Sequence, residues 1–141
     1  MLMKNLELNN FIALHRTVIK MDRTLSKIFD SHGLTTGQFA VLEALYHKGD
    51  LTIGQVQQKI LSTSGTMPLI IKNLESRKLL ERCPDPNDGR RCILHITDDG
   101  KTLMSKVFPV VKDKIIQMFS PIPLNKKQEL LDILKLFREE L

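Results

Sequence analysis

Residues 51–100 read LTIGQVQQKILSTSGTMPLIIKNLESRKLLERCPDPNDGRRCILHITDDG, and this stretch decides the fold. Apolar residues at helical spacing predict a short helix after Thr52 and another helix from Thr63 or Ser64 to about Lys78. Few residues separate the two apolar patterns. The sequence therefore predicts two helices joined by a tight connection.

A β-hairpin is expected directly after these helices. Leu79–Pro84 and Cys92–Thr97 are the predicted strands, and Asp85–Gly89 between them is rich in turn-forming residues. The second strand alternates, with one face formed by Cys92, Leu94 and Ile96 and the other by Ile93 and His95.

Two helices are predicted before this stretch. The first runs from about Leu6 to Asp30, and Gly33 is expected to cap it in a left-handed conformation. The second follows Thr35 or Thr36 as its N-cap. It directs three apolar side chains inward, which are Phe39, Leu42 and Leu45.

Two more helices are predicted after the hairpin. Thr97 or Asp98 is expected to cap a long helix that bends at Pro109, because proline removes a helical N–H. Asn125 and Gln128 resemble a capping box at the start of the last helix.

The first and last helices both carry narrow apolar seams. Their apolar residues alternate steps of three and four, as in coiled coils, and include Phe11, Leu14, Leu130, Leu134, Phe137 and Leu141. Two interpretations fit this pattern. The helices pack on each other within one chain, or they form a bundle between two chains.

The composition is that of an ordinary globular domain. The chain has 141 residues, of which 42% are hydrophobic and 26% charged, and this length can bury a substantial core. Two cysteines cannot build a disulfide framework, and no secretory signal or membrane-spanning run is visible. We therefore expect a cytoplasmic protein with reduced thiols, without membrane association.

Positive charge is concentrated in residues 59–91. The whole chain has a formal net charge of +5, and this segment contributes +3 from seven basic and four acidic residues. In a winged helix-turn-helix, one helix enters the major groove of DNA, and a hairpin called the wing reaches phosphates or the minor groove. The order of elements and the charge predict this class of DNA-binding domain.

An ordered series of short motifs resembles the MarR family of multiple antibiotic resistance regulators. The densest match covers residues 51–100, and the helices on either side also fit. The motifs are Leu51-Thr52, Ser64-Gly65-Thr66-Met67, Leu74-Glu75, Leu79-Leu80-Glu81-Arg82, Asp85-Pro86, Asp88-Gly89-Arg90-Arg91, Ile96-Thr97 and Gly100.

The resemblance implies a mainly α-helical fold with a small β-hairpin wing. A single MarR-type domain would cover residues 1–141, with the winged helix-turn-helix at about 34–100. Residues 1–33 and 101–141 would form dimerisation helices. The expected dimer contacts are the six seam residues named above, so the resemblance favours the bundle between two chains.

The implied function is that of a bacterial transcription factor, a homodimer that binds a pseudo-palindromic operator in double-stranded DNA. Most such proteins are repressors, and a small ligand, often an aromatic acid, or oxidation commonly releases the DNA. The resemblance places a ligand pocket between the dimer helices and the winged domain. Its candidate residues are His15, Arg16, Phe39 and Tyr46.

The expected DNA contacts lie on the helix that ends near Lys78 and at the wing. They are Ser62, Thr63, Ser64, Gly65, Thr66, Pro68, Leu69, Lys72, Asn73, Arg77, Arg90 and Arg91. Pro68 and Leu69 depart from the family pattern, and two interpretations remain. The helix starts one residue late, or these residues present an apolar edge to thymine methyl groups. Lys72 also departs from the pattern and is interpreted as a phosphate contact.

The wing carries two further hypotheses. Asp88 and Arg90 match the Asp-x-Arg signature of the family, which predicts an ion pair that orients the loop and leaves Arg91 to reach DNA. Cys83 and Cys92 face each other at disulfide distance if the hairpin pairs symmetrically, which would make the regulator redox-responsive. A shift of one residue would place the two thiols on opposite faces, where they simply pack.

Two other classes of function have less support. Enzyme fingerprints such as Gly-x-Ser-x-Gly or a P-loop are absent, and the four histidines are scattered, so we expect no enzyme, no metal site and no cofactor. A winged helix that contacts only proteins is the other alternative. It would lack the steep salt dependence of DNA binding.

Overall fold

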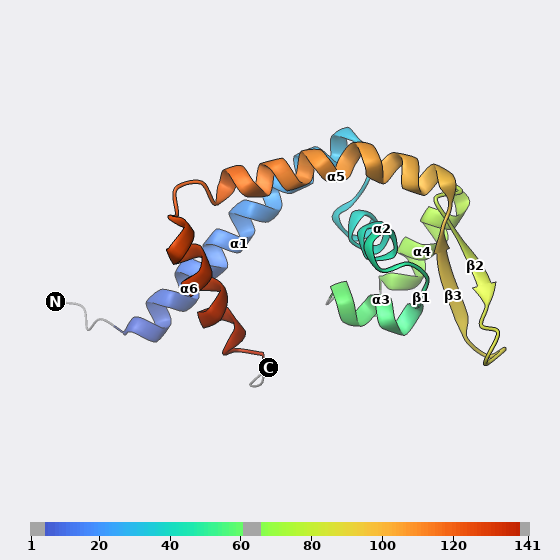
Figure 1. Cartoon of the computed structure of the whole chain (residues 1–141), viewed down its shortest axis with the longest axis horizontal. Helices are drawn as coiled ribbons and strands as arrows, with labels where there is room; N and C mark the ends of the chain where they lie inside the picture. The colour runs from blue at the N-terminus through green and yellow to red at the C-terminus, as the bar shows by residue number, and fades with distance from the viewer. Residues whose placement is uncertain (1–4, 61–65, 139–141) are drawn as a thin grey trace.

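A computed structural model of the chain describes residues 5–60 and 66–138. It shows a winged domain packed against two long helices (Figure 1). In chain order the elements are α1 (Leu6–Ser31), α2 (Thr36–Lys48), β1 (Leu51–Thr52), α3 (Ile53–Ile60), α4 (Met67–Ser76), β2 (Leu80–Pro84), β3 (Cys92–Ile96), α5 (Asp98–Met118) and α6 (Leu124–Lys135). The predicted fold class, mainly α-helical with a β-hairpin wing, is confirmed.

The connection between α1 and α2 is fixed by caps on both helices. Gly33 has the expected left-handed conformation, with a φ of 71°. Thr35 and Gln38 form a capping box at the start of α2, where each side chain accepts a hydrogen bond of 3.1 Å from the other's backbone N–H. These caps satisfy polar groups that both helices would otherwise leave unpaired.

The sheet has three strands rather than the two of the expected hairpin. Its order is β1-β3-β2, and both pairs of neighbours are antiparallel. In β1, Leu51 pairs with Leu94 of β3. A strand of two residues is too short to show periodicity in a sequence, so β1 could be found only from its tertiary pairing.

The core lies where α2, α4, the sheet and α5 meet. The inward residues predicted for α2, including Leu42 and Leu45, are buried. Val56 of α3 is buried, and Leu94 of β3 covers the core from the sheet. Met104 of α5 is fully buried.

Helix α4 begins later than expected. Its first residue is Met67 and its N-cap is Thr66, whereas the expected caps Thr63 and Ser64 lie outside the described residues. Pro68 stands in the first turn, where the backbone N–H has no helical partner to lose. This favours the interpretation of Pro68 as part of a late helix start.

The capping box expected at the start of α6 is wrong. Pro123 is the N-cap and has an extended conformation, without a hydrogen bond from its side chain. Asn125 therefore lies inside the helix, and the Gln128 amide donates to Asp132 Oδ1 at 3.0 Å. Proline fixes its own φ, which sets the entry of the chain without a polar cap.

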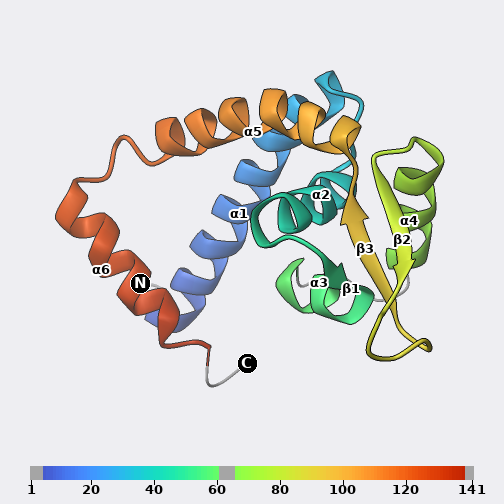
Figure 2. The same cartoon turned by 45° about the vertical axis from the view of Figure 1, so that its right-hand side comes forward.

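Helices α1 and α6 leave a large apolar surface uncovered. After α5 the chain turns back, and α6 runs toward the start of α1 (Figure 2). A groove of about 540 Å³ between the two helices is lined by Leu6, Glu7, Asn10, Phe11, Leu14, Leu130, Ile133, Leu134 and Phe137. Within one chain, packing of the two seams on each other is therefore incomplete.

Candidate nucleic-acid interface

Helix α4 buries one face and exposes the other. Met67, Ile71 and Leu74 are fully buried, whereas Leu69 keeps 60% of its surface exposed. Four other expected DNA contacts of this helix region lie on the exposed side with Leu69, namely Thr66, Pro68, Lys72 and Asn73. The structure thus brings together these expected contacts, while Ser62, Thr63, Ser64 and Gly65 lie outside the described residues.

The start of α4 and the tip of the wing lie at the same end of the domain. In Figure 2 both lie at the lower side, whereas the end of α4 lies close to the start of α5. A helix N-terminus beside a basic hairpin is the arrangement by which a winged helix-turn-helix contacts the major groove and the flanking backbone.

The wing tip is ordered by Asp88, but in a different way from the expected ion pair with Arg90. Asp88 Oδ1 accepts a hydrogen bond of 3.0 Å from the backbone N–H of Arg90. The ion pair of Asp88 is with Arg91, at 3.7 Å between Oδ2 and Nε. Arg90 forms no ion pair with any described residue, and both Arg90 and Arg91 are exposed to solvent.

The strand register contradicts the hypothesis of a Cys83–Cys92 disulfide and agrees with the alternative, a shift of one residue. Cys83 pairs with Ile93, and Cys92 pairs with Pro84. Because neighbouring residues of a strand point to opposite sides, the two thiols lie on opposite faces of the hairpin. Both cysteines are free and half-buried, and the redox hypothesis for this pair is withdrawn.

Arg77 is engaged within the chain, in contrast to its expected role at DNA. It is the C-cap of α4, and its Nη1 donates to the carbonyl oxygen of Gly33 at 2.7 Å. The same nitrogen lies 3.5 Å from Gln38 Oε1. The position of Arg77 at the end of α4 also separates it from the exposed residues at the start of that helix.

A concave surface beside the wing was not expected. A hollow of about 440 Å³ lies between the start of α3 and the start of β3, and Arg91 and Cys92 form its far side. On the near side Thr52 and Gln55 form a capping box, with hydrogen bonds of 2.9 and 3.2 Å. The spacing Thr-x-x-Gln is visible in the sequence and agrees with the helix start predicted after Thr52.

The four expected ligand-pocket residues do not form one pocket within a chain. Phe39 belongs to the core, where its ring stacks on Phe29 at 4.4 Å between centroids. Tyr46 is half-buried beside the core, whereas His15 and Arg16 are exposed on α1. The apolar spacing of Phe39, Leu42 and Leu45 in α2 thus indicated core packing for Phe39 rather than a ligand contact.

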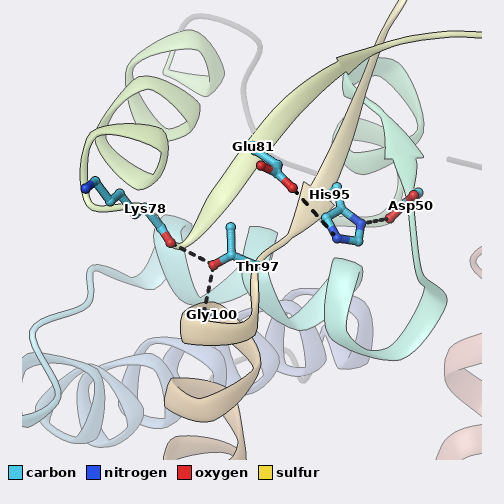
Figure 3. A network of polar contacts seen from close by, with 6 residues as sticks. All are labelled: Asp50, Lys78, Glu81, His95, Thr97 and Gly100. Atoms are coloured by element: carbon cyan, nitrogen blue, oxygen red, sulfur yellow. Dashed lines mark hydrogen bonds and ion pairs between the residues drawn. The ribbon is translucent and has the colours of Figure 1, made fainter.

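A polar cluster joins the three strands at the face opposite the core (Figure 3). His95 Nδ1 lies 2.6 Å from Asp50 Oδ1, and His95 Nε2 lies 4.0 Å from Glu81 Oε1. Asp50 precedes β1, so its contact with His95 holds this short strand against β3. Sequence reasoning missed this cluster because Asp50 and His95 are 45 residues apart.

Within residues 5–60 and 66–138, no three or more His, Cys, Asp or Glu side chains gather as a set that could hold a metal ion. None of the helices described in these ranges has the length and hydropathy needed to span a bilayer.

A profile of the MarR family matches residues 32–91 of this chain. The HTH-type transcriptional regulator MhqR of Bacillus subtilis (strain 168) is 36% identical over 125 residues, which cover 89% of this chain and 86% of MhqR. This chain belongs to the MarR family.

Solved structures share the fold. A mutant of MarR from E. coli in complex with operator DNA has a TM-score of 0.85 and 21% identity, over 98% of this chain and 99% of that one. BpsR of Bordetella bronchiseptica has a TM-score of 0.81 and 24% identity, over 90% of this chain and 96% of that one. The BpsR structure concerns regulation of its DNA binding by 6-hydroxynicotinic acid.

Membership of the MarR family makes this chain a DNA-binding transcriptional regulator with a winged helix-turn-helix fold. The comparisons identify relatives that are transcriptional regulators rather than enzymes. The exposed face of α4 and the wing are the surfaces of this MarR-family chain that match the chemistry of DNA contact.

Proposed function

We propose that this protein represses transcription by binding a two-fold symmetric operator as a homodimer. The observation that carries the proposal is the joint placement of the exposed α4 residues and the wing tip at one end of the domain (Figure 2). Leu69, Lys72 and Asn73 would face bases and phosphates in the major groove, and Arg90 would reach the flanking phosphates or minor groove. Thr66, the N-cap of α4, would add a further contact, and the expected contacts at residues 62–65 belong to the same proposal.

The proposed dimer uses the seams of α1 and α6. Phe11, Leu14, Leu134 and Phe137 are between 39% and 64% exposed in one chain, which is unfavourable for so many large apolar side chains. A second copy would cover the groove between the helices, and the resulting two-fold axis would match a pseudo-palindromic operator.

Selection of bound sequences from random duplex DNA tests this function. We expect an enriched site with two inverted half-sites about one helical turn apart, bound with a steep dependence on salt. A protein-interaction module without operator binding predicts no enrichment. A reporter gene downstream of the enriched site then separates repression from activation.

We further propose that a small aromatic carboxylate releases the DNA. A cleft of about 640 Å³ between α2, α3 and the residues after α6 is lined partly by basic or imidazole side chains, namely His47, Lys48, Lys59 and Arg138, against one carboxylate, Glu43. Such a lining suits a carboxylate ligand. The ligand named for the structural relative BpsR, 6-hydroxynicotinic acid, is of this chemical class.

Calorimetric titration of the protein with benzoate tests the effector site, and neutral benzamide is the matched control. The carboxylate cleft is supported if benzoate binds, benzamide does not bind, and Lys59→Met weakens the binding of benzoate. Equal binding of both compounds, or binding that Lys59→Met leaves unchanged, contradicts it.

A further inference from the structure

Helix α4 ends in a Schellman motif that contains an unusual residue. The N–H of Leu79 bonds the Leu74 carbonyl at 3.0 Å, and the N–H of Lys78 bonds the Glu75 carbonyl at 2.9 Å. Lys78 has a φ of 60° and is the one non-glycine residue with positive φ in the described chain. This tight ending points the chain directly into β2 and brings the preceding residue, Arg77, toward the α1–α2 connection.

Helix α1 ends in the same motif. The N–H of Leu34 bonds the Phe29 carbonyl at 2.9 Å, and the N–H of Gly33 bonds the Asp30 carbonyl at 3.0 Å. The carbonyl oxygen of Gly33 takes no part in these two bonds. That oxygen accepts the hydrogen bond of 2.7 Å from Arg77 Nη1.

The second partner of Arg77 is a buried polar side chain. Gln38 is 7% exposed and is the only buried polar side chain among the described residues. Its Oε1 already accepts the Thr35 N–H of the capping box at 3.1 Å and lies 3.5 Å from Arg77 Nη1. Arg77 therefore contacts the end of α1 and the first turn of α2 at once.

We propose that Arg77 is a positioning residue, which sets the orientation of α4 for DNA by tying its end to the α1–α2 connection. The Arg77 contacts act at the end of α4 opposite the residues that face DNA. A change in the tilt of α4 at that end therefore moves the residues of its first turn, which are proposed to contact DNA. A hydrogen bond from a charged donor is strong enough to hold such an orientation. This inference rests on the proposed function of α4 as the reading helix.

The alternative role for Arg77, a phosphate contact, predicts a different outcome. A phosphate contact acts on all sequences equally and contributes to the salt dependence of binding. A positioning residue acts on the operator, where base contacts need an exact helix orientation, and leaves random duplex binding unchanged.

The test compares Arg77→Met with Lys72→Met, which removes the same charge from the exposed face of α4. For Arg77→Met we expect about tenfold weaker operator binding, with random-duplex affinity and salt slope unchanged. For Lys72→Met we expect equal losses on both DNAs and a flatter salt slope. Arg77→Lys should restore operator affinity to within about threefold, because Nη1 alone makes both contacts.

Hydrogen exchange provides a readout without DNA. In Arg77→Met the amides of Leu79 and Leu34 should exchange faster than in the wild type, while Lys72→Met should leave them unchanged. The proposal would be overturned if Arg77→Met lost equal affinity for operator and random duplex and showed a flatter salt slope. It would also be overturned if Arg77→Met left operator affinity or the exchange of these amides unchanged. If the wild-type protein binds no DNA, the proposed function is contradicted instead. Hydrogen exchange of the Leu79 and Leu34 amides in Arg77→Met then decides whether Arg77 holds α4 to the α1–α2 connection.

Discussion

At the scale of single residues, Lys78 has a conformation that favours glycine. Its φ of 60° brings Cβ close to the backbone, at a cost of about 1 kcal/mol for an L-residue. We expect Lys78→Gly to raise the free energy of unfolding by up to about 1 kcal/mol, reduced by the greater entropy of glycine in the unfolded chain. Lys78→Ala is the control, since it removes the charge but keeps Cβ. Equal denaturation midpoints for both variants would contradict this explanation.

Arg90 and Arg82 both belong to the wing but differ in their ion-pair partners, so a change at Arg82 is the control for a change at Arg90. Arg82 lies 3.4 Å from Glu75, whereas Arg90 has no ion pair with a described residue. We expect Arg90→Ala to weaken binding to operator and random DNA alike. It should also reduce the slope of log affinity against log salt concentration by about one. Arg82→Ala should leave the slope nearly unchanged. Measuring affinity at several salt concentrations checks both, and a slope that Arg90→Ala does not alter would argue against a phosphate contact.

At the scale of secondary-structure elements, the start of α5 packs unusually close to the chain that leaves α4. Thr97 Oγ1 donates to the Lys78 carbonyl at 2.7 Å and accepts the Gly100 N–H at 3.1 Å (Figure 3). A Cβ on Gly100 would overlap the Leu79 carbonyl oxygen. We therefore expect Gly100→Ala to lower the free energy of unfolding by roughly 1–3 kcal/mol.

Gly54 provides the control for this contact, because a Cβ there meets nothing within 4 Å. Gly54→Ala should leave the free energy of unfolding unchanged or raise it slightly, since alanine favours helix. Chemical denaturation of both variants measures the difference. A loss for Gly100→Ala no larger than for Gly54→Ala would show that the two elements can move apart.

The reading role of α4 predicts a change in base preference. Asn73 is exposed on the face that carries Leu69 and Lys72, and its amide can bond a base edge. We expect Asn73→Ala to lower operator affinity by roughly 1–3 kcal/mol and to relax preference at one position of each half-site. Ser76→Ala, at the other end of α4, is the control. Equal losses on every sequence would show that Asn73 contacts only the backbone.

At the scale of the whole molecule, the uncovered groove between α1 and α6 predicts a dimer. We expect Leu134→Asp together with Phe137→Asp to reduce the mass in solution to that of one chain and to abolish operator binding, because charges cannot be buried without partners. Lys126→Asp changes charge on an exposed residue of α6 that does not line the groove, and should stay dimeric. Analytical ultracentrifugation measures both. A wild-type monomer at micromolar concentration would contradict the dimer.

The helices, the caps of α1, α2 and α5, and the buried face of α2 could be predicted from the sequence because these features depend on neighbouring residues. The cap expected for α6 was wrong because Pro123 takes its place. Gly33, Thr35 and the inward residues of α2 all follow from spacing within one or two turns. The exposed residues of α4 could be predicted for the same reason, since the spacing of Met67, Ile71 and Leu74 determines which face is buried.

Other features were decided by contacts between residues far apart in the chain. The third strand needs Leu51 to pair with Leu94, and the tie of α4 needs Arg77 to reach Gly33, 44 residues away. The wing shows a related limit, because a register shift of one residue separated Cys83 from Cys92. Pairing and register depend on how the whole domain closes around its core, and local periodicity carries no information about that closure.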